Sequence, residues 1–234
     1  MVREELIKKS PLRILEKSTH GGVGKGNIGV IAARKGVGKT ACLVHIATDQ
    51  LFQDKHVIHV SFASSTQHII NWYEEIFTEI AKRRNLESAM DVHDKIIRNR
   101  VIMNFNQDGV RIAQVISSIK SLIENGAFAA DCIIVDGYNF AKSSNADLAL
   151  FQAAAAELGL EFWFSASLRG EEGKIGQDGI PVILQPFLAQ IAILIMLQSD
   201  NDMIHLHLAK DHEDKITEDL HLKLDPKVLL ITRE

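Results

Sequence analysis

The chain alternates between short apolar runs and longer segments in which apolar residues recur every three or four positions. The apolar runs predict strands at residues 28–33, 56–62, 101–105, 132–135 and 161–165. The periodic segments predict helices at residues 41–53, 67–84, 86–98, 110–124 and 147–158. Strands that alternate with helices in this way form a parallel sheet with helices on both faces. The expected fold class is therefore α/β in three layers, with a mainly parallel central sheet.

The two ends of the chain follow different patterns. Residues 2–9 and 11–17 read as short helices, so we expect a helical segment over residues 1–20 ahead of one domain over residues 21–234. Near the carboxyl end, apolar runs at 191–197, 203–208, 220–224 and 228–231 are separated only by turns, which predicts an antiparallel extension of the sheet. Between these regions, residues 169–181 are rich in glycine and charge, which predicts a mobile loop.

A glycine-rich sequence, RKGVGKTA, joins the first predicted strand to the helix that follows it. Glycine allows the main chain to curl so that successive N–H groups point at an anion, and the start of a helix adds further donors. We therefore predict that nucleotide phosphates bind to Arg34, Lys35, Gly36, Val37, Gly38, Lys39, Thr40 and Ala41. Lys39 is the candidate catalytic lysine that neutralises the β- and γ-phosphates, and the Thr40 hydroxyl is a candidate ligand of Mg²⁺.

A carboxylate completes the predicted metal site. Asp136 comes directly after the apolar strand at 132–135, and an acid at the end of such a strand holds Mg²⁺ opposite the loop hydroxyl in many phosphate-binding proteins. The Asn-Lys-x-Asp signature that reads guanine is absent at residues 139–142. The expected cofactors are therefore ATP and Mg²⁺, with Asp136 and Thr40 as metal ligands.

The sequence GGVGKGNIGVIAARKGVGKT at residues 21–40 resembles the opening of RecA-like ATPases, particularly DnaB-type replicative helicases and KaiC-like ATPases. The similarity continues through VDGYNF at 135–140, FSASLRG at 164–170 and LAK at 208–210. Family members often carry alanine at the position of Ala33. The resemblance implies a RecA-like core, ATP and Mg²⁺ as ligands, and a homo-oligomeric ring or filament with nucleotide near the subunit interface.

Several positions depart from that family. Ala63 stands where such ATPases carry a water-polarising glutamate, and Gly137 follows the metal-binding aspartate where other P-loop ATPases place one. Ser165 lies in the region of the polar sensor, and Lys210 keeps the lysine of a Lys-x-Arg pair whose arginine is replaced by His212. An arginine of this kind contributes about 10³–10⁵ in rate. We expect ATP binding with weak or partner-stimulated hydrolysis, and we assign catalytic roles to Lys39, Ser165 and Lys210.

Two other functions stay open. A DNA-processing motor, such as a helicase, recombinase or loader, would bind nucleic acid, but the formal net charge is −4 and loop 169–181 carries more acids than bases. A P-loop kinase that transfers phosphate to a small molecule would explain a mobile loop and a missing water-polarising acid. Its loop would normally hold several arginines, and only Arg169 is present.

The remaining composition favours a cytoplasmic protein that does not enter a membrane. The amino-terminal residues are charged, and the apolar run at 191–197 is too short to span a bilayer. Cys42 and Cys132 lie in apolar segments and read as core thiols. His45 and His59 have apolar neighbours and read as hydrogen-bonded core residues.

Overall fold

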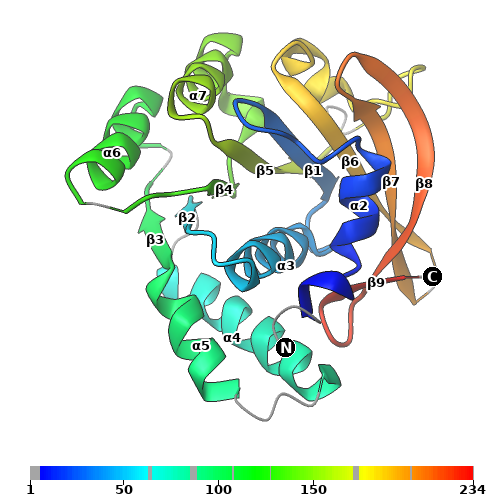
Figure 1. The fold of residues 1–234 in the computed structure, drawn as a ribbon. Coiled ribbons are helices and arrows are strands. Elements are labelled where there is room, and N and C mark those ends of the chain that lie inside the picture. The colour runs from blue at the N-terminus through cyan, green and yellow to red at the C-terminus, as the bar shows by residue number, and fades with distance from the viewer. Residues whose placement is uncertain are drawn as a thin grey trace.

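The structure, a computed structural model, describes residues 6–62, 65–84, 89–106, 108–126, 128–170, 174–200 and 202–233. These residues form one nine-stranded sheet with the strand order β3-β2-β4-β5-β1-β6-β7-β8-β9 (Figure 1). The strands are β1 (Ile28–Arg34), β2 (Val57–Ser61), β3 (Arg100–Asn104), β4 (Cys132–Asp136), β5 (Glu161–Leu168), β6 (Ile191–Asp200), β7 (Met203–Asp211), β8 (Asp214–Asp225) and β9 (Leu230–Arg233).

Helices cover both faces of the sheet, which confirms the three-layer α/β prediction (Figure 1). One face carries α2 (Leu12–Ser18), α3 (Lys39–Phe52), α4 (Thr66–Arg84) and α5 (Ala89–Arg98). The other face carries α6 (Ile112–Glu124) and α7 (Asn145–Leu158). Each side has its own apolar core because the buried strands between them present apolar residues in both directions.

The strands from β3 to β6 are parallel, so their carboxyl ends meet at one edge of the sheet. Two expectations needed correction. Strand β5 continues to Leu168 rather than ending at Ser165, because it stays paired with β1 as far as Arg34. Strand β6 pairs in parallel with β1, so the antiparallel extension begins only at β7.

Strands β7, β8 and β9 are antiparallel, as predicted, although β8 begins at Asp214, earlier than residue 220. At the amino end, residues 6–8 are helical and Leu12 and Leu15 of α2 are buried in the core on the α3 side. Residues 2–5 of the first expected helix lie outside the described residues.

Part of the segment predicted as a mobile loop is structured. Ile175 and Pro181 form an isolated antiparallel bridge, and the Asp178 carboxylate accepts hydrogen bonds from Lys215 and Gln185. A 3-10 helix, η3 (Val182–Phe187), then buries Leu184 and Phe187, which the sequence pattern did not predict. None of the helices in the described parts of the chain is long and apolar enough to cross a membrane.

Candidate phosphate and magnesium site

The glycine-rich loop lies between the carboxyl end of β1 and the first turn of α3. Gly36 and Gly38 adopt φ values of 84° and 105°, in the left-handed region that glycine tolerates best. Ala33 is still inside β1 and does not have a positive φ, so alanine is unstrained at a position where the full motif has glycine. The loop conformation therefore depends on the two glycines closest to Lys39.

Gly38 also makes a close approach that only the tertiary structure reveals. A Cβ atom on this residue would lie 2.3 Å from Cδ2 of Leu224, which is buried in β8. The phosphate loop is thus packed directly against the antiparallel part of the sheet. Gly36, by contrast, has no heavy atom within 4 Å of the same position, so its neighbourhood is open.

Lys39 is 7% exposed and is held over the loop by two main-chain carbonyls. Its Nζ donates to the carbonyl oxygen of Ala33 at 3.1 Å and to that of Arg34 at 2.9 Å. Burial lowers the pKa of Lys39, and the nearby Asp136 carboxylate opposes that shift. The ammonium group is therefore already desolvated at the place where phosphate oxygens could replace the carbonyl oxygens as its partners.

Thr40 and Asp136, the two residues assigned to the metal, lie in contact. The Thr40 hydroxyl donates to Oδ2 of Asp136 at 2.9 Å, which joins the first turn of α3 to the end of β4. Asp136 is buried, with 6% of its surface exposed. A hydroxyl oxygen beside a carboxylate oxygen is the hard donor set that Mg²⁺ prefers, so these two residues fit the ion that the motif implies.

Ser165 lies one strand away and positions the chain after Asp136. Its hydroxyl oxygen accepts a hydrogen bond from the Gly137 N–H at 2.8 Å. Because β5 is longer than expected, Ser165 sits within the strand and is 3% exposed. Contact between Ser165 and a γ-phosphate stays a prediction.

Lys210 is placed by different contacts. Its Nζ donates to the carbonyl oxygen of Ile191 at 2.7 Å and also to that of His212, and the side chain is 8% exposed. Reaching the nucleotide of a neighbouring subunit would require Lys210 to exchange these partners. Its catalytic role stays a prediction, and Ala63 lies outside the described residues.

Arg169 is a cation near the loop that the sequence analysis did not place there. Its predecessor, Leu168, pairs with Arg34 in the register between β5 and β1. After burial, which is the main cause, the positive charge of Arg169 further lowers the pKa of Lys39. The signal that could have found it is the length of β5, because the register brings residue 169 beside the loop only if the strand reaches residue 168.

Comparison with known proteins agrees with this architecture at the level of fold. No protein-family model and no curated protein matches the sequence. Among solved structures, the chain is similar to an ATPase domain of a DnaB-like helicase, with a TM-score of 0.70 and 16% sequence identity. The match covers 96% of this chain and 90% of that chain. The protein therefore has the RecA-like fold of a P-loop ATPase domain.

Proposed function

We propose that this protein binds Mg-ATP at the loop formed by residues 34–41. The observation that carries the proposal is the hydrogen bond between Thr40 and Asp136 beside the buried ammonium of Lys39. This arrangement places one cation and two hard oxygen donors around a loop whose glycines curl the main chain. Few ligands other than a polyphosphate with its divalent cation use all three features together.

The division of roles follows from the contacts. Main-chain N–H groups of the loop and the start of α3 bind phosphate oxygens, and Lys39 supplies the compensating positive charge. Thr40 and Asp136 would hold Mg²⁺, which neutralises phosphate charge when bound. Ser165 keeps the Asp136–Gly137 peptide in place through its 2.8 Å hydrogen bond.

Calorimetric titration with Mg-ATP tests the binding. The wild-type protein should give saturable heat, and Lys39→Ala should weaken binding by about a hundredfold, because it removes a desolvated charge that pairs with phosphate. The matched control is Lys35→Ala, a lysine in the same loop whose side chain is exposed and which should change affinity much less. An absence of heat with the wild type, or equal effects of the two substitutions, would contradict the proposal.

We also propose that hydrolysis is slow in isolated chains and is stimulated by self-association or by a partner. Gly137 has no side chain to polarise water, and Ala63 has no carboxylate. Turnover of Mg-ATP in dilute protein should lie below about 1 s⁻¹, the lower end for ordinary enzymes, and should rise with protein concentration if a neighbouring subunit completes the site.

A matched pair of substitutions sharpens this expectation. Ala63→Glu should raise turnover, whereas Ala63→Gln, which has the same shape without the charge, should not. Rapid turnover in dilute wild-type protein, unchanged by concentration, would refute slow hydrolysis. An equal response to the two variants would show that residue 63 does not face the attacking water.

A further inference from the structure

A cavity of about 550 Å³ lies along the carboxyl-terminal half of α3, away from the phosphate loop. Its walls come from distant parts of the chain: Leu6 near the amino end, Phe52 of α3, Ile80 of α4 and Leu230 of β9. Figure 1 shows the blue amino-terminal turn and the red β9 lying close together at this side of the molecule. Cavities of this size hold ligands the size of a drug or a metabolite.

One wall of the cavity carries an unusual polar group, the imidazole of His45. Its Nδ1 accepts a hydrogen bond from the main-chain N–H of Ile231 at 2.9 Å, so in the neutral ring the proton must be on Nε2. Burial lowers the pKa of His45 to about 4, which keeps the ring neutral near pH 7. No group in the described ranges of the chain bonds to Nε2, although the side chain is only 4% exposed. His45 thus contributes an unpartnered N–H donor to the cavity wall.

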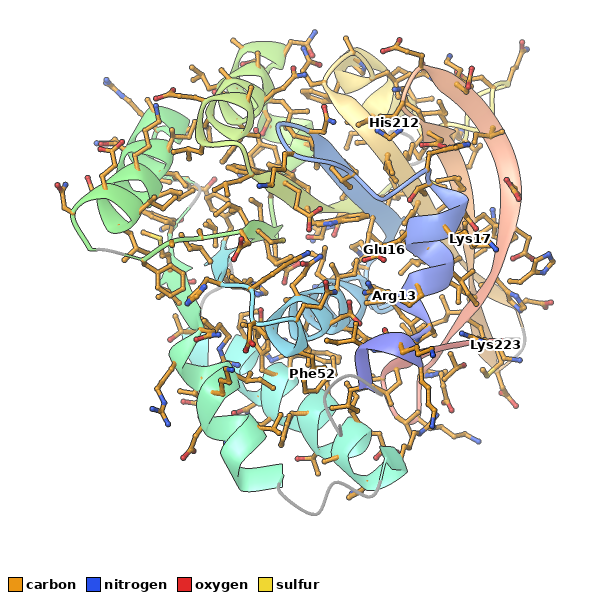
Figure 2. The ribbon with its side chains drawn as sticks, in the orientation of Figure 1. Arg13, Glu16, Lys17, Phe52, His212 and Lys223 are labelled. Atoms are coloured by element: carbon orange, nitrogen blue, oxygen red, sulfur yellow. The ribbon has the colours of Figure 1, made fainter. Side chains whose placement is uncertain are left out.

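The charged groups around the cavity are mostly positive. Lys9, Arg83 and Arg233 line it together with a single acid, Asp49. The Asp49 carboxylate already accepts hydrogen bonds from the Arg13 guanidinium and from the Gln53 amide. Figure 2 shows Arg13 reaching from α2 toward α3, where this pair forms. The acid is therefore neutralised within the protein, and the cationic lining is left to act on a ligand.

We propose that this cavity binds a small organic carboxylate that has an apolar body. The apolar body fills the space between Phe52, Ile80 and Leu230, where its burial is favourable. The carboxylate supplies the acceptors that the His45 N–H lacks and the negative charge that complements Arg233 and its neighbours. The site is separate from the phosphate loop, because α3 is 14 residues long and its two ends are about 20 Å apart.

Nuclear magnetic resonance on protein with ¹⁵N-labelled histidine tests the contact at His45, with decanoate as the probe. The Nε2 signal of His45, assigned from its loss in His45→Gln, should shift saturably as decanoate is added. The signals of His205 and His207 on β7, which do not line the cavity, should stay in place. Decanol, which has the same body without the charge, should bind at least about tenfold more weakly.

Calorimetry with decanoate on a small set of variants tests the rest of the site. Thr232→Trp fills the cavity and should abolish binding, and Arg233→Gln removes an exposed cation and should weaken binding by about threefold. The matched control is Lys223→Gln, a cation opposite Thr232 on the neighbouring strand that does not line the cavity and should bind normally. Lys39→Ala should also bind decanoate normally, so this site can fail or succeed independently of ATP binding.

Three results would overturn the proposal. They are the absence of a saturable shift at His45, equal affinities for decanoate and decanol, and equal binding by Arg233→Gln and Lys223→Gln. If Thr232→Trp does not fold, as judged by circular dichroism, the comparison of Arg233→Gln with Lys223→Gln still decides the matter, because both substitutions replace a lysine or arginine outside the buried core.

Discussion

Helix α3 presents two sites of opposite character at its two ends. At the amino end, Lys39 and Thr40 face the loop and Asp136, and most of the groups that would contact a ligand come from eight consecutive residues. Toward the carboxyl end, His45 and Phe52 line a cavity whose other walls come from both termini of the chain. One site is polar and local in sequence, and the other is largely apolar and is assembled from distant segments.

The difference teaches how binding and stability are coupled in each site. The charged groups at the loop can be replaced with little loss of apolar contact, so changes there should act mainly on ligand affinity. The cavity residues hold the amino-terminal segment, α3 and β9 together, so changes there should act on folding as well. Three predictions test this contrast, from the largest expected effect to the smallest.

Gly38 is the exception that should break the contrast, because the loop touches the antiparallel strands there. Gly38→Ala introduces a positive-φ alanine and a contact at 2.3 Å with buried Leu224, so it should lower the free energy of unfolding by about 2–4 kcal/mol. Gly36→Ala meets open space and should cost only about 1 kcal/mol. Urea denaturation measures both, and equal losses would show that contact with β8 is unimportant.

The pH dependence of stability should separate the buried His45 from its surroundings. Because the folded-state pKa of about 4 lies below the usual 6.5, unfolded chains bind more protons as the pH falls. The stability contributed by neutral His45 is therefore complete above pH 6.5 and is lost on acidification toward pH 4. The loss should reach about 2 kcal/mol at pH 5.

Urea denaturation between pH 7.5 and pH 5 measures this slope in the wild type and in His45→Gln, whose amide can still accept from Ile231. The variant should show a shallower decline. Burial raises the pKa of Asp49, which acts in the opposite direction, but Asp49 is present in both proteins and its effect cancels in the difference. Identical slopes would show that His45 does not titrate on unfolding.

Arg169 should have the smallest effect, and one confined to the phosphate site. Arg169→Ala removes a cation whose field already reaches Lys39, so affinity for Mg-ATP should fall by about threefold while stability stays within about 0.5 kcal/mol. Arg98→Ala, at the end of α5, is the control and should leave calorimetric affinity unchanged. A larger loss would mean that Arg169 contacts phosphate directly and is not only a nearby charge.

Sequence patterns were reliable where a feature is built from neighbouring residues. The periodicity of residues 67–84 and the run at 132–135 predicted α4 and β4 to within a residue at each end. Patterns failed where pairing decides the outcome. Nothing within residues 161–168 shows that β5 continues past Ser165, because that extension depends on pairing with β1. The parallel direction of β6 likewise depends on its neighbour and not on its own apolar residues.

The order of residues alone determined the phosphate loop and its candidate metal ligands, because a glycine turn, a lysine and a hydroxyl act through main-chain geometry over a few positions. It also determined that Asp136 would end a strand. Only the tertiary structure decided that Asp136 meets Thr40, that Gly38 meets Leu224, and that Leu6, His45 and Arg233 surround one cavity. Such contacts join residues far apart in the chain, and they form only when burial of the apolar faces fixes how the elements pack.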